Sequence, residues 1–179
     1  DPRFTIIGPP PARKEVEENG IKVWSFERQN VGPAVMEINV QAPWRYRSQV
    51  RFSTMSTWDP YVGWVRDLFR QSGKITPKLS KKAKSLVAKT TTIEKTIDTI
   101  YRFAVEEIQY EQDYARVIEG WEPHLPDQVL DRKYGDCKDK SMLIITMLRS
   151  LGIEAEPALI RTWKLGDIDR SLPGSQFNH

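Results

Sequence analysis

The chain has 179 residues, of which 27 are Lys or Arg and 24 are Asp or Glu, giving a formal net charge of +3. With 39% hydrophobic residues, 12 Pro and 10 Gly, its composition is that of a folded globular chain, which excludes the disordered and collagen-like classes. The longest apolar stretch, residues 142–148, is interrupted by Thr146. It falls far short of the ~20 residues that span a bilayer, so we expect no transmembrane segment.

Cysteine and histidine are scarce. The single cysteine, Cys137, excludes an intramolecular disulfide, and with only two histidines a structural zinc site is not expected. We therefore expect neither a metal nor a cofactor. The small net charge argues against a dedicated nucleic-acid-binding protein. The N-terminal residues 1–4 lack the basic and apolar regions of a signal peptide, so any export signal would lie outside this sequence.

The first third of the chain has the pattern of β-strands. Asn19-Gly20, between residues 14–18 and 21–28, predicts a hairpin, because this pair tolerates the two positive φ angles of a type I′ turn. In residues 46–53, Tyr46, Ser48, Val50 and Phe52 alternate with Arg and Gln side chains. In a strand this pattern lets the first set form a buried face while the Arg and Gln side chains stay in solvent. We interpret residues 1–57 as part of a β-sandwich.

Helical patterns begin at Trp58-Asp59-Pro60. The first helix is predicted to end at Gly73, a second to begin at Thr76-Pro77, and a third to follow the capping sequence at residues 91–94. The second helix carries a cluster of lysines. These are Lys78, Lys81, Lys82, Lys84 and Lys89. A phosphate-binding surface is one interpretation, but a solvated helix face is favoured because no aromatic residue interleaves with the lysines.

The segment between the third helix and the cysteine is predicted to be mostly irregular. Residues 108–110 are expected to form a short strand or turn, residues 116–126 a loop, and residues 127–133 a short helix. His124 lies in this proline-bounded loop, where we expect a surface residue. Trp121 and Tyr134 are candidates for the walls of a site, although packing roles are the more common explanation.

The most informative segment surrounds Cys137. Gly135 permits a turn, Asp136 is a good N-cap, and Asp139 stands at the third helical position, so a helix is predicted to start at Cys137 and to close at Gly152. Its apolar residues cover most of its circumference, which places it centrally in the fold. Unpaired N–H groups and the helix dipole favour a thiolate at this start.

A nucleophilic role for Cys137 needs a histidine partner, because Asp136 and Asp139 oppose thiolate formation. The candidates are His124, 13 positions upstream, and His179, 42 positions downstream. Residues 153–162 are predicted to form a strand, with His179 on or near the next one. From these residues alone, a small buried hydrophobic side chain in a packed helix is the commoner explanation of a lone cysteine.

A family resemblance changes that balance. The sequence Gly135-Asp136-Cys137-Lys138-Asp139-Lys140, the helix ending at residues 148–155, and Phe177-Asn178-His179 resemble the core of the bacterial transglutaminase-like superfamily, as does the lead-in at residues 126–130. Upstream, residues 29–31, residues 52–54 and Trp58 resemble a domain of unknown function that often precedes this core. Together the resemblance covers nearly the whole chain.

The resemblance implies an α+β fold. A partial β-sandwich (residues 1–57) and a helical connector (58–90) would precede a papain-like core (91–179), in which the cysteine helix packs on an antiparallel sheet. It also implies that Cys137 is the nucleophile and His179 the base. The family's third residue, an Asp on the strand after the histidine, has no counterpart, so we expect the sheet to be incomplete here and the full protein to continue beyond residue 179.

Two functions remain open. The first is cysteine-dependent acyl chemistry on amide bonds of a protein or peptide substrate, with hydrolysis ranked slightly ahead of transfer to an amine. The second is a non-catalytic binding or scaffolding module that keeps the fold. The resemblance implies export to the periplasm or cell envelope, although one unpaired cysteine is also compatible with the cytoplasm. The sequence leaves the oligomeric state open.

Overall fold

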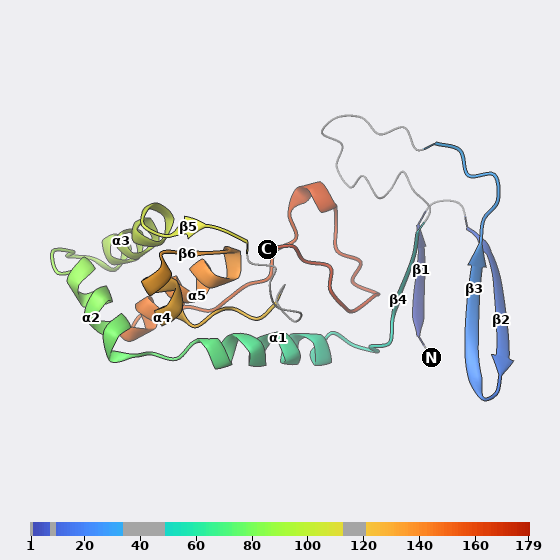
Figure 1. Ribbon diagram of the computed structural model, residues 1–179, viewed down its shortest axis with the longest axis horizontal. Coiled ribbons are helices and arrows are strands. Elements are labelled where there is room, and N and C mark those ends of the chain that lie inside the picture. The colour runs from blue at the N-terminus through green and yellow to red at the C-terminus, as the bar shows by residue number, and fades with distance from the viewer. Residues whose placement is uncertain (1, 8–9, 34–48, 113–120) are drawn as a thin grey trace. The chain divides into compact units, whose positions relative to one another are not determined.

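The computed structural model describes residues 2–7, 10–33, 49–112 and 121–179. The chain divides into two compact units, which are described one at a time (Figure 1). Unit 1 comprises Asp1–Tyr61 with Ile160–Asn178, and unit 2 comprises Val62–Leu159 with His179. The mixture of helices and strands confirms the α+β class.

The described residues of unit 1 form two antiparallel strand pairs. Strand β1 (Arg3–Ile7) pairs with β4 (Gln49–Ser53), and β2 (Ala12–Glu18) pairs with β3 (Ile21–Glu27). The hairpin prediction is confirmed, since Asn19 and Gly20 have φ angles of 53° and 77°. Phe4 on β1 contacts the rings of Trp24 and Phe26 on β3, with centroids 5.7 and 5.2 Å apart. These ring contacts join two sheets of only two strands each, which do not by themselves establish a β-sandwich, so the β-sandwich stays a prediction.

The predicted buried face of residues 46–53 is wrong at Phe52. Residues 46–48 lie outside the described part of the chain, and β4 begins at Gln49. Phe52 is 69% exposed although it pairs directly with Phe4, whereas the neighbouring Ser53 is buried. The β1–β4 ladder has only two strands, and its contacts with β3 run through Phe4 and not through Phe52.

The helices follow the sequence prediction closely. Their bounds are α1 (Asp59–Ser72), α2 (Pro77–Leu86), α3 (Ile93–Glu106), α4 (Pro126–Arg132) and α5 (Cys137–Ser150). Gly73 N–H donates to Phe69 O at 3.1 Å at the end of α1. The Thr76 hydroxyl caps α2, and the Thr92 hydroxyl caps α3, one residue later than the capping sequence suggested.

Helix α5 is the centre of unit 2 and contacts α2, α3 and α4 (Figure 1). Its buried residues include Leu143 and Met147, which belong to the same core cluster as one fully buried residue from each neighbouring helix. These are Leu79, Ile100 and Val129. Burying one such aliphatic side chain stabilises a fold by about 1.5–3 kcal/mol, so this packing fixes where α5 begins.

The sheet next to α5 differs from the prediction. Strand β5 (Gln109–Tyr110) pairs with β6 (Tyr134–Gly135) in parallel. Among the described residues no antiparallel strand pair belongs to the sheet next to α5, and residues 153–162 form neither a strand nor a helix. Asn178 N–H donates to Ile160 O at 3.1 Å, and a short 3-10 turn at Trp163–Leu165 follows. A strand needs a continued ladder, which a single such bond does not provide.

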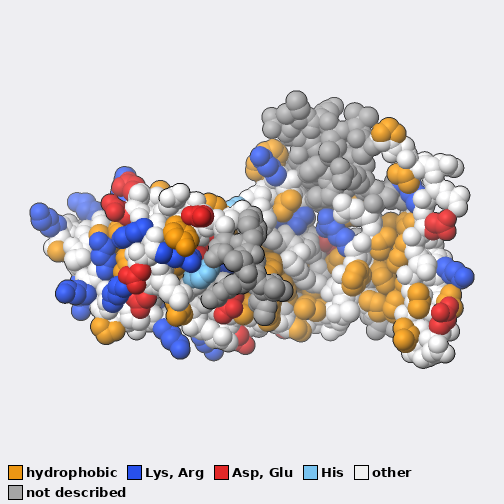
Figure 2. Space-filling model, in the orientation of Figure 1, with side chains coloured by type: hydrophobic (Ala, Val, Ile, Leu, Met, Phe, Trp, Pro, Cys, Tyr) orange, Lys and Arg blue, Asp and Glu red, His pale blue; other side chains and the backbone are white. Residues whose placement is uncertain are grey.

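The lysine cluster lies on an exposed surface. Figure 2 shows blue Lys and Arg side chains over the end of unit 2 formed by α2 and α3. Lys78 is paired there with Asp131, and the Lys82 ammonium lies 4.8 Å from the Phe103 ring centroid.

Among the described residues, no helix combines the length and apolarity needed to cross a bilayer. Nor do they contain a group of three His, Cys, Asp or Glu side chains suited to a metal ion.

Candidate active site

The first turn of α5 is closed by two carboxylates that act reciprocally. Asp136 is the N-cap, and its Oδ1 accepts a hydrogen bond from Asp139 N–H at 3.3 Å. Asp139 Oδ2 accepts one from Asp136 N–H at 3.4 Å. This capping box satisfies N–H groups that have no partner within the helix. The prediction that the helix starts at Cys137 is confirmed.

Gly135 makes this arrangement possible. A Cβ atom at this position would lie 2.7 Å from Asp139 Cβ and 3.0 Å from Asp139 Oδ2. Both distances are shorter than the ~3.5–4.0 Å at which such atoms normally meet. Because glycine has no side chain, β6 can lead directly into α5, and the position of Cys137 is fixed by the end of that strand.

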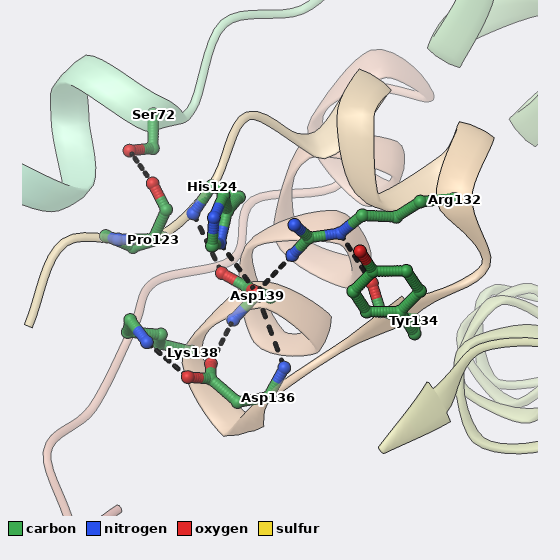
Figure 3. A network of polar contacts seen from close by, with 8 residues as sticks. All are labelled: Ser72, Pro123, His124, Arg132, Tyr134, Asp136, Lys138 and Asp139. Carbon is green, nitrogen blue, oxygen red and sulfur yellow. Dashed lines mark hydrogen bonds and ion pairs between the residues drawn. The ribbon is translucent and has the colours of Figure 1, made fainter. Parts of the chain in front are cut away.

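Asp139 is the centre of a buried polar network (Figure 3). Its carboxylate is 1% exposed, and its Oδ2 lies 3.0 Å from His124 Nδ1 and 2.9 Å from Arg132 Nη2. Its Oδ1 accepts the backbone N–H of His124 at 2.8 Å. A carboxylate at this depth is stable only when it is paired and fully hydrogen-bonded. The network therefore fixes the α5 start to the loop before α4 and to the end of α4.

The expectation that His124 is a surface loop residue is wrong. Its side chain is only 10% exposed and points toward Asp139 (Figure 3). The preceding residue is also held, because Ser72 Oγ donates to Pro123 O at 2.8 Å. The anchored Pro123 and the buried Asp139 carboxylate together hold the imidazole inward. The residue that could have indicated this burial from the sequence is Asp139, because a carboxylate at a buried helix start needs cationic or hydrogen-bond-donating partners.

The Cys137 thiol is partly buried, and its surroundings favour the protonated form. Burial raises the pKa of Cys137 most strongly, and the Asp136 carboxylate raises it further. The pKa is lowered by the backbone N–H of Lys138, by the Lys138 charge and by a hydrogen bond from Tyr110. Lys138 Nζ is itself paired with Asp136, which weakens both charges as seen by the sulfur. The helix start alone does not produce a thiolate.

Tyr110 is a site residue that the sequence analysis did not identify. It ends β5, directly opposite Gly135 in the parallel register, and it lowers the pKa of Cys137. Tyr110 is 49% exposed. The sequence signal was weak, because a two-residue strand carries no periodicity from which a pairing partner can be inferred.

His179 ends the described chain as an exposed residue of the unit that contains Cys137. The preceding residue, Asn178, is held by hydrogen bonds to Thr162: Thr162 N–H donates to Asn178 Oδ1 at 2.9 Å, and Asn178 Nδ2 donates to Thr162 Oγ1 at 3.0 Å. The predicted pairing of His179 with Cys137 stays a prediction.

Trp121 and Tyr134 make packing contacts. Trp121 lies against Trp64, with ring centroids 5.9 Å apart. The Arg132 guanidinium lies 4.5 Å from the Tyr134 ring centroid, and Arg132 Nε donates to Tyr134 O at 2.9 Å. Tyr134 thus orients the arginine that neutralises Asp139, a cation–π contact of the ordinary kind.

Comparison with known proteins gives one family and one related fold. Residues 80–171, more than half of the chain, match the model of the transglutaminase-like superfamily. The crystal structure of a "putative protease" from Parabacteroides distasonis ATCC 8503 is similar, with a TM-score of 0.69 and 18% sequence identity. The likeness covers 97% of this chain and 33% of that protein, so the chain spans about a third of its length. A comparison with curated proteins found no match.

The structural likeness, at this identity, concerns the fold. The family match concerns the site as well as the fold, because the matched residues include Cys137, the capped start of α5, and Arg132, which is paired with Asp139. The resemblance of residues 29–58 to an accompanying N-terminal domain stays a prediction. On the family match and the sequence motif around Cys137, the chain belongs to the transglutaminase-like superfamily.

Proposed function

We propose that the chain carries the nucleophilic half of a cysteine-dependent enzyme that acts on amide bonds of a protein or peptide. Cys137 is the nucleophile and His179 is the general base and later the acid. The observation that carries the proposal is the placement of a partly exposed thiol on the first residue of a capped, centrally packed helix. The family match and the protease-named structural neighbour support the reaction class.

The thiol environment defines what the partner must do. Burial and Asp136 raise the pKa of Cys137, so an imidazole has to take its proton and leave an ion pair. His124 is held in the buried network, where its imidazole is paired with the Asp139 carboxylate that Arg132 also contacts. His179 is the other histidine of the chain, and we assign the role of base to it.

The proposed reaction proceeds in two halves. The imidazole removes the Cys137 proton, the sulfur attacks the amide carbonyl carbon, and backbone N–H groups at the α5 start stabilise the resulting oxyanion. The C–N bond then breaks, the leaving amine takes the proton from the imidazolium, and a thioester remains. Water, deprotonated by the imidazole, attacks the thioester and releases a carboxylic acid and the free thiol. An amine in place of water would give transfer, and we rank hydrolysis first.

A specific observation favours the alternative of a non-catalytic module. The surroundings of Cys137 within its own turn raise the pKa of the thiol, as expected where no nucleophile is required. A domain that keeps the fold for binding would have an ordinary or raised thiol pKa.

We also propose export to the cell envelope, which cell fractionation with an antibody to the chain would test.

Acylation by 4-nitrophenyl acetate tests the proposal. The protein as it exists should form one acetylated species at pH 7, located on Cys137 by mass spectrometry, and release one equivalent of nitrophenolate in a burst. Cys137→Ser should abolish the burst, and His179→Ala should slow it. Adding a primary amine should leave the turnover nearly unchanged if water is the acceptor, and should accelerate it if the enzyme is a transferase. An acetylation rate equal to that of a free thiol would favour the non-catalytic module.

A further inference from the structure

Arg161 holds the chain segment that leads to His179 through three backbone carbonyls. Its Nε donates to Gly166 O at 2.7 Å, and its Nη2 donates to Leu165 O at 2.5 Å. Its Nη1 donates to Gln176 O, fifteen positions further along the chain. A guanidinium carries five N–H donors in a rigid planar fork, so one side chain fixes the 3-10 turn and the returning segment relative to each other.

Gln176 closes the same loop from its other end. Its side chain is buried, its Oε1 accepts Asp169 N–H at 2.8 Å, and its Nε2 donates to Asp169 O at 2.8 Å and to Leu172 O at 2.6 Å. The next residue, Phe177, stacks on Tyr61, with ring centroids 6.2 Å apart and ring planes 15° from parallel. The returning segment is therefore held both by side-chain hydrogen bonds and by ring packing.

Asn178 fastens the position next to His179. Asn178 N–H donates to Ile160 O at 3.1 Å, and the Asn178 side chain makes two hydrogen bonds with Thr162, at 2.9 and 3.0 Å. Ile160 and Thr162 flank Arg161, so the arginine and Asn178 join the same two segments from neighbouring positions. Because consecutive Cα atoms are about 3.8 Å apart, the backbone of His179 takes its position from Asn178.

We propose that Arg161, together with Asn178, is a positioning residue that holds His179 where its imidazole takes the Cys137 proton. This rests on the proposed function, because the position of His179 matters only if its imidazole is the base. His179 is exposed, so the placement of its ring depends mainly on the backbone that carries it. A general base acts within about 2.6–3.2 Å of the group whose proton it removes, and small displacements of that backbone are therefore costly.

Two substitutions loosen this segment to different degrees. Arg161→Lys keeps the charge but replaces the fork by one ammonium, which cannot reproduce bonds made from three separate nitrogens. Asn178→Ala, at an exposed position, removes the two Thr162 bonds and keeps the backbone bond. Arg149→Lys is the matched control, because Arg149 Nε also donates to a backbone carbonyl, that of Ala155, at 2.9 Å.

The measurement is the rate of iodoacetamide alkylation of Cys137, the sole cysteine, from pH 5 to 10. At pH 6 the rate should fall about tenfold in Arg161→Lys and about threefold in Asn178→Ala, since a misplacement of about 1 Å can cost about 100-fold in rate. In the alkaline range, where the thiol ionises unaided, the rates should stay equal. Arg149→Lys should keep the profile of the unchanged protein, and adding Arg161→Lys to His179→Ala should change nothing further at pH 6.

The outcomes separate this inference from the proposed function. If either folded variant reacts at pH 6 as fast as the unchanged protein while His179→Ala does not, the inference is overturned and the proposed function stands. A tenfold fall that persists in the His179→Ala background also overturns it, because Arg161 would then act by another route. If the unchanged protein itself reacts only in the alkaline range, the proposed function fails and the inference fails with it. Thermal melting curves show which variants are folded, and Asn178→Ala decides the test if Arg161→Lys does not fold.

Discussion

His124 Nδ1 lies 3.0 Å from Asp139 Oδ2, so two residues that are 15 positions apart in the sequence form a buried pair directly beneath the cysteine turn. Arg132 completes the pair from the end of α4. Asp139 is thereby a structural residue of the α5 start, and its charge is compensated before it can influence the thiol. The other acidic neighbour, Asp136, is the one that raises the pKa of Cys137.

Removing the His124 imidazole should destabilise the protein. His124→Ala leaves Asp139 with Arg132 and two backbone N–H groups, those of residues 124 and 136, and we expect a loss of about 1–3 kcal/mol in the free energy of unfolding. His124→Asn should retain part of that stability, because its amide can donate from nearly the same place as Nδ1. The two variants are compared by urea denaturation.

The chain offers its own control for this prediction. His179 is exposed, so His179→Ala should leave the free energy of unfolding within about 0.5 kcal/mol. Equal losses for His124→Ala and His179→Ala would contradict the assignment of the buried histidine.

A methyl group at Gly135 should disturb the helix start. Gly135→Ala would place a Cβ 2.7 Å from Asp139 Cβ, so either β6 or the first turn of α5 must move. We expect a destabilisation of about 1–3 kcal/mol and a changed alkylation rate of Cys137.

Gly63→Ala is the matched substitution in a helix interior. Nothing lies within 4 Å of a Cβ at Gly63, which is part of α1. There alanine should stabilise the helix by about 0.5–1 kcal/mol relative to glycine. The sign of the two changes, read from thermal denaturation, should therefore be opposite. The same sign at both positions would refute the close approach at Gly135.

Neutralising Asp136 should make the thiol more acidic. Asp136→Asn keeps a good N-cap residue but removes the carboxylate that raises the pKa of Cys137. The pKa of the thiol should fall, and alkylation at pH 7 should become faster, most visibly in a His179→Ala background where no imidazole pairs with the sulfur.

The substitution at Asp136 also leaves the Lys138 ammonium without its partner, and Lys138 is buried. Some stability should therefore be lost, about 1–3 kcal/mol. Slower alkylation of the folded variant at pH 7 would show that the Asp136 charge is not what holds the thiol protonated.

Local signals in the sequence were sufficient for the helices and for the start of the cysteine helix. Pro60, Thr76 and Asp136 each combine a capping or first-turn preference with an apolar pattern, and the structure places helix starts beside each of them. The hairpin at Asn19-Gly20 is local in the same sense, because the turn residues determine the register.

Contacts between distant segments could not be predicted in this way. The parallel pairing of β5 with β6 depends on the packing of α3 and α4 against α5, and neither two-residue strand has a pattern of its own. His124 was predicted to be exposed because proline-bounded loops usually lie at the surface, and its burial follows from Asp139 and Ser72, which are distant in sequence. Residues 153–162 have strand-like alternation, but a pattern alone supplies no partner strand.

The pH dependence of Cys137 alkylation, measured for the unchanged protein and for His179→Ala, tests the account most directly because the chain has no other thiol. If His179 pairs with the sulfur, the unchanged protein should show a rate plateau that extends below pH 7. Burial and Asp136 raise the pKa of the thiol, so His179→Ala should react only in the alkaline range, where the unassisted thiol ionises. Two identical profiles, both rising only in the alkaline range, would contradict the cysteine–histidine pair.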